Sequence, residues 1–262
     1  MADVDSLPPG SFCWPELATT DRKSGVAFYR DLFGWAVDDQ PIGPEDIYSM
    51  FKLRGREVAA AYTMRADERQ MGIPPHWNTY VSVKNADEAA KRAQELGGKI
   101  VVPPFDVMDA GRMAVLQDPT GAFFQVWQAN KHVGTKVQGE AGALCWTELA
   151  TRDTKAAETF YTQFFGWSAK TGNADSTMPY TEFSLGGRGI GGMMPMPAMV
   201  PAQVPAYWMP YFQVADVNAT VDKATKSGAS TVVPPTDMAN VGRFAVITDP
   251  QGAIFAAFTP AR

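Results

Sequence analysis

The sequence is poor in the residues that usually build metal centres and nucleic-acid surfaces. Only two cysteines and two histidines occur among its 262 residues, and the cysteines do not have the close spacing of a zinc site. Lysine and arginine (23) are outnumbered by aspartate and glutamate (28), so the formal net charge is −5. This balance argues against nucleic acid or an anionic membrane as the main partner.

Long hydrophobic runs are also missing. No apolar stretch approaches the roughly 20 residues that a membrane-spanning helix needs. The first residues, MADVDSLPPG, have neither the basic start nor the apolar centre of a secretion signal. Hydrophobic residues make up 45% of the chain and charged residues 19%, which is typical of a globular protein with a sizeable core. We therefore expect a cytoplasmic protein.

What the sequence does contain is a long internal repeat. FYRDLFGW (28–35) returns as FYTQFFGW (160–167), 132 positions later, and the segment 101–124 returns as 232–255. A period this long, seen twice, indicates duplicated domains rather than a solenoid. The expected organisation is a first domain over 1–130, a linker over 131–141 and a second domain over 142–262.

Each copy reads as a mixture of short strands and two helices. Apolar residues recur with helical spacing over 21–33 and 87–96, and glycine follows each segment. The strands expected in the first copy are 12–18, 48–53, 57–63, 77–83, 99–102, 112–117 and 122–128. Helices that alternate with antiparallel hairpins favour an α+β fold with curved sheets over a doubly wound parallel sheet.

Two motifs then suggest a family. The helix end FY…LFGW, the hairpin GR…DPTG and the paired βαβββ modules resemble the vicinal oxygen chelate superfamily, in particular tandem glyoxalase-like proteins of actinobacteria. That superfamily includes glyoxalase I, bleomycin-resistance proteins and extradiol dioxygenases. The resemblance implies that the two modules of each domain form an open, cup-shaped mixed sheet. It does not select one activity, because lyases, isomerases, oxygenases and pure binding proteins share this fold.

The resemblance also implies where metal ligands would stand. In metal-dependent relatives, four histidine, glutamate or glutamine side chains point into the cup. Carried over by register, these positions hold Trp14, Asn78, Gln125 and Ala60 or Ala61 in the first copy, and Trp146, Met209, Ala256 and Gly192 or Met193 in the second. Tryptophan, alanine and methionine are poor ligands for hard and borderline cations. We expect no metal and no cofactor in either domain.

Strand alternation predicts the lining of each cup. The first cup is expected to contain Phe12, Trp14, Glu16, Ala18, His76, Asn78, Tyr80, Ser82, Phe123, Gln125 and Trp127. The second is expected to contain Trp146, Glu148, Met209, Tyr211, Ile254, Ala256 and Phe258. Such aromatic walls with few polar groups favour a small organic ligand. The cysteines Cys13 and Cys145 are expected on the backs of their strands.

Glu16 and Glu148 allow two interpretations. A carboxylate in a half-buried strand is costly unless it is paired or used. Arg112 and Arg243 recur at the start of a later strand and could form a structural ion pair with these glutamates, or take part in ligand binding. Alternatively, each glutamate is a general base with a raised pKa.

The two histidines differ in their expected roles. His76 is two residues from Asn78 on the same strand face, so it is either an acid–base group at the cup or a partly exposed residue at a strand end. His132 falls in the linker, and we expect it to be exposed to solvent.

Three functions remain open from the sequence. The first is a metal-free protein that binds or sequesters a small organic molecule. The second is a glyoxalase-like lyase, isomerase or hydroxylase that acts on a reactive carbonyl or aromatic compound with an inward glutamate as base. The third is a fold that serves only as an interaction module. In each case we expect the two domains to pair within the chain, which is then a monomer or a homodimer.

Overall fold

The computed structural model describes residues 6–44, 46–172 and 179–261. The first half contains β1 (Phe12–Thr19), α1 (Arg22–Phe33), β2 (Ala36–Pro41), β3 (Ile47–Leu53), β4 (Arg56–Thr63), α2 (Ala66–Gln70), β5 (His76–Ser82), α3 (Ala86–Glu95), β6 (Lys99–Val107), β7 (Gly111–Gln117) and β8 (Phe123–Ala129). The second half contains β9 (Leu144–Thr151), α4 (Thr154–Phe165), β10 (Ser168–Gly172), β11 (Tyr180–Leu185), β12 (Arg188–Pro195), β13 (Tyr207–Gln213), α5 (Val217–Lys226), β14 (Ser230–Met238), β15 (Gly242–Thr248) and β16 (Ile254–Pro260).

The strands form two eight-stranded mixed sheets, one from each half of the chain. The first sheet has the order β2-β3-β4-β1-β5-β8-β7-β6, and the second repeats this order with β10-β11-β12-β9-β13-β16-β15-β14. The central strands β1 and β5 are antiparallel to each other, whereas β4 is parallel to β1 and β8 is parallel to β5. This arrangement confirms the predicted α+β fold with two curved sheets.

Local sequence explains the ends of the repeated helices. Asp21 caps α1 by accepting a hydrogen bond from the Ser24 amide, and Asp153 caps α4 through the Ala156 amide. Gly34 and Gly166 follow these helices with φ of 71°, a left-handed conformation that glycine adopts without strain. The glycine of the repeated FGW motif is therefore a helix cap. Among the described residues, no helix is long and apolar enough to cross a membrane.

The strand β6 is longer than the segment 99–102 that its sequence predicts. It continues through Pro103 and Pro104 to Val107 because it is the outermost strand of its sheet. An edge strand tolerates proline, since one of its sides makes no ladder hydrogen bonds.

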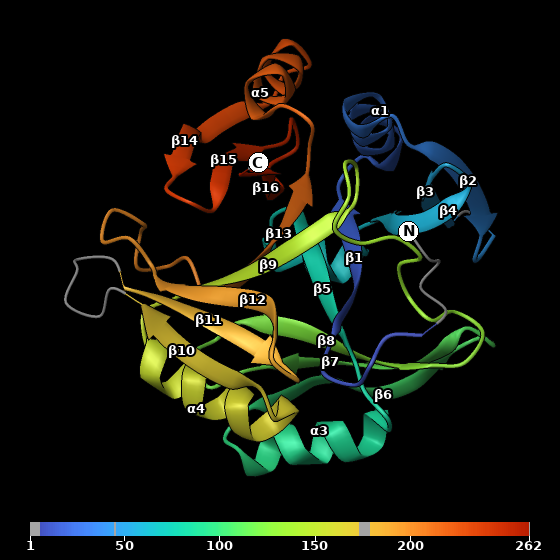
Figure 1. Ribbon diagram of the computed structural model, residues 1–262. Coiled ribbons are helices and arrows are strands. Elements are labelled where there is room, and N and C mark those ends of the chain that lie inside the picture. Colours follow the sequence, from blue (N-terminus) through green and yellow to red (C-terminus); the bar gives the residue numbers. More distant parts are fainter. Residues whose placement is uncertain (1–5, 45, 173–178, 262) are drawn as a thin grey trace.

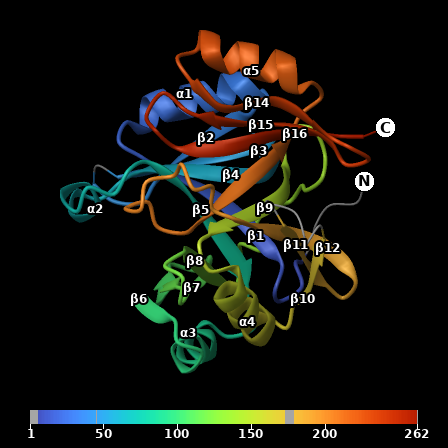
Figure 2. The same cartoon turned by 90° about the vertical axis from the view of Figure 1, so that its left-hand side faces the viewer.

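Each half of the chain completes the core of the other half. One apolar cluster combines α1 and the back of β3 and β4 with residues of α5, β13, β15 and β16; a second combines α3, β7 and β8 with α4 and β13. Accordingly, α1 lies beside α5 and α3 lies beside α4 at opposite ends of the molecule (Figure 1). Figure 2 shows the same two helix pairs on either side of the sheets.

The repeated motifs meet at these two contacts. The Tyr29 hydroxyl donates to Asp249 Oδ2 at 3.0 Å, and the Tyr161 hydroxyl donates to Asp118 Oδ2 at 2.9 Å. Each tyrosine belongs to an FY…FGW segment, and each aspartate belongs to the DP-turn of the other half. The motifs that repeat most clearly in the sequence therefore hold the two domains together.

A β-bulge corrects two expectations about the first strand. The register between β1 and β5 shifts between Phe12 and Trp14, so Phe12 does not share the face of Trp14. Phe12 instead packs between Trp167 and Trp208, with ring centroids 5.3 and 5.1 Å away. Cys13, a buried free thiol, joins the cluster of Trp14 rather than lying on the back of the strand. The extra residue of the bulge reverses the alternation at this point.

Candidate functional site

On the concave face of each sheet, side chains from the four central strands lie next to one another. In the first sheet, Glu16 is directly opposite Ala60 of β4 and Asn78 of β5. Trp14 is opposite Tyr80, which in turn is opposite Gln125 of β8. Glu16, rather than Trp14, is therefore level with Asn78.

A chain of hydrogen bonds surrounds Glu16. Trp14 Nε1 donates to the Tyr48 hydroxyl at 3.0 Å, and that hydroxyl donates to Glu16 Oε1 at 2.7 Å. The Tyr80 hydroxyl donates to Glu16 Oε2 at 2.9 Å. The carboxylate thus lies between two phenols, deep in the cup and almost closed off from solvent.

The second cup repeats the same chain. Trp146 Nε1 donates to the Tyr180 hydroxyl at 2.8 Å, and the Tyr211 hydroxyl donates to Glu148 Oε1 at 2.9 Å. Tyr180 also hydrogen-bonds Glu148. We call this arrangement the Trp–Tyr–Glu–Tyr chain: hydrogen bonds link Trp14, Tyr48, Glu16 and Tyr80 in the first domain, and Trp146, Tyr180, Glu148 and Tyr211 in the second.

Sequence reasoning found three members of this chain and missed the fourth. Tyr48 and Tyr180 stand 132 positions apart, the same interval that separates Glu16 from Glu148. Comparison of the two copies at polar positions could have revealed them. Gly192 makes room for Tyr180, because a Cβ there would lie 2.0 Å from its hydroxyl.

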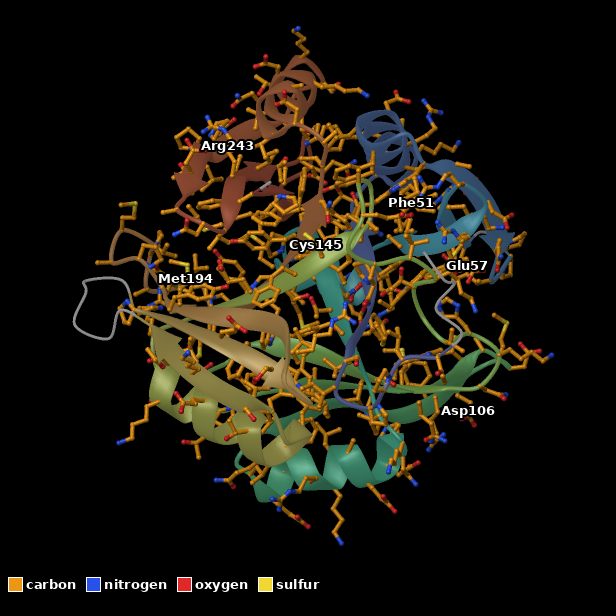
Figure 3. All side chains as sticks on the ribbon, in the orientation of Figure 1. Phe51, Glu57, Asp106, Cys145, Met194 and Arg243 are labelled. Carbon is orange, nitrogen blue, oxygen red and sulfur yellow. The ribbon has the colours of Figure 1, made fainter. Side chains whose placement is uncertain are left out.

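The first cup is more polar than the second. Asn78 Nδ2 lies 3.3 Å from both Glu16 Oε2 and the Tyr62 hydroxyl, and Gln125 Nε2 donates to Asn78 Oδ1 at 2.8 Å. The second cup has Met209 and Ala256 at the positions of Asn78 and Gln125. Met194 of β12 (Figure 3) takes the position of Tyr62.

Neither cup has the donor set of a metal centre. At the level of Glu16 and the adjacent level of Tyr80, the first cup offers one carboxylate and the amides of Asn78 and Gln125. The matching positions of the second cup offer the single carboxylate of Glu148. In the first cup, the amides are engaged with Glu16 and with each other. No group of three or more histidine, cysteine, aspartate or glutamate side chains within 6–44, 46–172 and 179–261 could hold an ion. These residues do not fit the metal of the metal-dependent relatives.

The two arginines do not reach the glutamates. Arg112 contacts Asp87 at 2.8 Å and Asp106 at 3.0 Å, on the side of the sheet that α3 covers. Arg243 contacts Asp237 at 2.7 Å and lies on the outside of the molecule beside β14 (Figure 3). Alternation along β7 turns Met113, not Arg112, into the cup. The structure thus contradicts the predicted ion pairs and takes both arginines out of the expected ligand contacts.

Burial dominates the acidity of both glutamates. Desolvation raises the pKa of the Glu16 carboxyl above its usual value, and hydrogen bonds from Tyr48, Tyr80 and Asn78 oppose that rise. Desolvation likewise raises the pKa of Glu148, against hydrogen bonds from Tyr211 and Tyr180. A carboxyl group of this kind can take up and release a proton closer to neutral pH than an exposed one.

This environment predicts a specific pH dependence of stability. Because the pKa of Glu148 is higher in the folded than in the unfolded chain, its stabilising contribution is present below the unfolded pKa and is lost as the pH rises through the folded pKa. Glu148→Gln cannot ionise and should lose less stability than wild type between about pH 4 and about pH 7. Urea unfolding at a series of pH values measures this, with exposed Glu182→Gln as the control. Parallel wild-type and Glu148→Gln profiles would contradict it.

The structure agrees with the second interpretation of His76 and contradicts the expectation for His132. His76 begins β5, opposite Ala18, and its Nδ1 lies 2.8 Å from the Pro74 carbonyl oxygen. It is partly exposed at the strand end. His132 was expected to be exposed, but only 18% of its side chain is accessible. Its ring packs edge-on against the Trp14 ring, with 4.6 Å between the ring centroids. Periodicity could not place it, because it belongs to neither a helix nor a strand.

Aromatic side chains flank the first cup at its open edge. Phe105 is opposite Met113, which is opposite Trp127, so all three share the concave face. Phe123 shares that face with Gln125 two residues later. Phe105 and Phe123 are 42% and 44% exposed, a large accessible ring surface. The second domain has Thr236 and Ile254 at these positions.

Two grooves lie outside the cups. One, of about 410 Å³, runs between α3 and α4 and is lined by Leu96, Pro119, Asp153, Lys155, Ala156, Thr159, Phe160 and Gln163. The other, of about 290 Å³, lies beside Arg112 and Met108. The cup side chains, by contrast, pack against one another. A ligand therefore enters a cup only if partly exposed side chains such as Tyr48 move aside.

Comparisons with known proteins agree with this architecture. A family model described as Glyoxalase/Bleomycin resistance protein/Dioxygenase superfamily matches residues 12–126 and 143–256. "Putative glyoxylase CFP32" of Mycobacterium bovis is 41% identical over 251 residues, covering 95% of this chain and 94% of that protein. "Anthracycline biosynthesis protein DnrV" of Streptomyces peucetius is 34% identical over 261 residues, covering 94% and 92%.

Solved structures share the fold at low identity. The 2,3-dioxygenase LapB of Pseudomonas sp. KL28 superposes with a TM-score of 0.67 at 14% identity, covering 100% of this chain and 94% of LapB. The Mn(II)-bound glyoxalase of Novosphingobium aromaticivorans gives a TM-score of 0.65 at 12% identity, covering 96% and 82%. At this identity the likeness concerns the fold alone.

Proposed function

The chain belongs to the glyoxalase/bleomycin resistance protein/dioxygenase superfamily, and from that premise we propose that it is a metal-free protein that binds a small aromatic molecule in its cups. The observation that carries the proposal is the Trp–Tyr–Glu–Tyr chain, which both domains build on the concave face of the sheet. A buried carboxylate without a cationic partner is costly to keep. Its occurrence in both copies supports a role in ligand binding or chemistry.

The lining favours a flat aromatic ligand that carries hydroxyl or carbonyl groups. Exposed rings of Phe105 and Phe123 can stack on such a molecule, while the tyrosine and amide groups at the base can hydrogen-bond its oxygens. The relative DnrV is named for anthracycline biosynthesis, and anthracyclines are hydroxylated polycyclic quinones. We propose that a compound of this chemical class is bound or sequestered.

The absence of a metal is part of the proposal. It is supported by the donor chemistry of the two cups, in which a single carboxylate is surrounded by phenols and by amide or apolar side chains. After dialysis, elemental analysis of the purified protein should find no stoichiometric zinc, nickel, iron or manganese. About one equivalent of retained metal per chain would contradict the proposal. Addition of a chelator should leave the thermal stability of the protein unchanged.

A second candidate function is catalysis on the same type of molecule. The observation that favours it is a carboxyl group of raised pKa placed between two phenols, which could move a proton next to a carbonyl. The protein would then be a lyase, isomerase or hydroxylase acting on a reactive carbonyl or aromatic compound. This alternative would be selected if the protein turns over such a compound and if the single variants Glu16→Gln and Glu148→Gln each abolish turnover but still bind the compound.

Titration with alizarin, a dihydroxyanthraquinone, tests the binding proposal. Tryptophan fluorescence and calorimetry should show saturable binding of at most two molecules per chain. Glu16→Gln should weaken binding in the first cup about tenfold, which corresponds to roughly 1.4 kcal/mol. Arg243→Ala, outside the cups, is the control and should bind as wild type does. The proposal fails if binding is not saturable, or if neither Glu16→Gln nor Glu148→Gln changes it.

A further inference from the structure

His132 adds an imidazole to the wall of the first cup. Its ring lies 4.6 Å from the Trp14 ring and 6.0 Å from the Trp127 ring, and Trp127 Nε1 donates to its carbonyl oxygen at 2.8 Å. Both tryptophans belong to the cluster that fills this cup. A residue between the two domains thus becomes part of the wall of the first one.

Glu57 orients the imidazole. His132 Nδ1 lies 3.3 Å from Glu57 Oε2, and this contact holds the pKa of the Glu57 carboxyl below its usual value. A carboxylate at Nδ1 keeps the proton on that nitrogen and leaves Nε2 as the hydrogen-bond acceptor. The same division of roles makes a histidine a general base in many enzymes.

The outer nitrogen has no partner. His132 Nε2 is buried and makes no hydrogen bond among the described residues. Gln125 Oε1, an acceptor in the same cup, also has no partner among those residues. The Gln125 side chain is buried, with only 4% of the residue exposed. Buried polar atoms are normally hydrogen-bonded. Both acceptors are therefore free to accept hydrogen bonds from a ligand that brings hydroxyl donors.

The second domain has no carboxylate at the position that matches Glu57. Gly189 stands at the position of Glu57, and a Cβ there would lie 3.3 Å from a ring carbon of Trp146. The two histidines of the printed sequence, His76 and His132, lie in its first half and in the segment that joins the two halves. The contrast makes the pair specific to the first cup.

We propose that Glu57 and His132 form a carboxylate–imidazole dyad that takes the proton of an acidic hydroxyl, a phenol or an enol, on a ligand bound in the first cup. This inference rests on the proposed function and names the group that the site recognises. The ligand O–H bond breaks and its electron pair stays on oxygen, while the proton forms an N–H bond at Nε2. Glu57 stabilises the resulting imidazolium, and Gln125 Oε1 accepts a second hydroxyl.

Two lysines act on the carboxylate of the dyad. Glu57 faces His132 from β4, and Lys52 of β3 and Lys136 lie close enough to act on Glu57 electrostatically. The apolar rings of Trp14 and Trp127 pack against the imidazole. Both orphaned atoms are closed to water, so a ligand reaches them only after side chains at the rim move aside.

The visible spectrum of alizarin provides the test, because its absorption moves to longer wavelength when a phenol ionises. At a pH where free alizarin is mostly un-ionised, wild-type protein should bind the dye in its ionised form. His132→Asn should still bind the dye but leave it un-ionised, and Glu57→Gln should lower the ionised fraction at least several-fold. Lys131→Ala, an exposed neighbour that pairs with Asp109, is the matched control and should behave as wild type.

A second measurement needs no variant. With only two histidines in the chain, long-range ¹H–¹⁵N NMR can follow each ring, and Nε2 of His132 should become protonated when alizarin binds. The dyad is refuted if wild-type protein binds the dye un-ionised, or if His132→Asn and Glu57→Gln ionise it as wild type does; the binding proposal then stands. If the dye shows no saturable binding, the proposed function and the dyad both fail.

Discussion

Asp118→Ala should lower the free energy of unfolding by about 3 kcal/mol, and Asp249→Ala should have a similar effect. Asp118 Oδ2 accepts the buried Tyr161 hydroxyl, while Oδ1 accepts the amides of Thr120 and Ala122. Removal of the carboxylate leaves several buried donors unpaired at once. A hydrogen bond to a charged group contributes about 1.5–3 kcal/mol, and one carboxylate here supports more than one of them.

Urea unfolding of the two variants measures these losses. Asp109→Ala is the control, because Asp109 forms an exposed pair with Lys131, and pairs of that kind contribute at most about 1 kcal/mol. Asp118→Asn should recover part of the loss, since one amide oxygen can still accept hydrogen bonds. A loss below about 1 kcal/mol in both alanine variants would show that the contact between domains does not depend on these aspartates.

The second large effect concerns the polar base of the first cup. Asn78→Leu should weaken alizarin binding by about 1–3 kcal/mol, because Asn78 connects Glu16 with Gln125 and its loss leaves both without that partner. Met209 stands at the matching position of the second cup. Because Met209→Leu conserves volume and polarity, it should change alizarin binding little.

Calorimetric titration of both variants with the same dye decides this prediction. Thermal melts of each variant, recorded alongside, separate loss of binding from loss of folding. A site that hydrogen-bonds its ligand rejects molecules that cannot pair with it, whereas an apolar site discriminates weakly. Equal losses, or a larger loss from Met209→Leu, would place the principal site in the second domain.

Much of the fold follows from periodicity and from the repeat. The alternation of strands and capped helices predicts the α+β architecture, and comparison of the two copies predicts two sheets of the same topology. The inward positions of Glu16, Asn78, Tyr80 and Gln125 also follow from simple alternation. These features depend on local patterns, which a single sequence contains.

Other features depend on long-range geometry that no local pattern contains. The bulge near Trp14 turns Phe12 away from the cup, because one inserted residue reverses the alternation. Arg112 finds its acidic partners on the outer face, Asp87 and Asp106, only once α3 and β6 are in place. His132 enters the first cup through its contacts with Trp14 and Glu57, far away in the sequence.

The repeat therefore has two separate roles. The FY…FGW and DP-turn segments of opposite halves join the domains, while Glu16 and Glu148 with their tyrosines form a polar centre in each cup. The two cups differ in the surroundings of that centre. The first cup contains amides, exposed phenylalanines and the Glu57–His132 pair, and we therefore expect it to bind the ligand with more hydroxyl groups.

A crystal structure of the protein in complex with alizarin is the most direct test of the claim that the cups are the binding sites. We predict that the dye lies in the first cup, with its rings against Phe105 or Phe123 and its hydroxyls toward Gln125 Oε1 and His132 Nε2. Dye bound only in the groove between α3 and α4, beside Leu96, Pro119 and Phe160, with both cups still packed by their own side chains, would contradict the account.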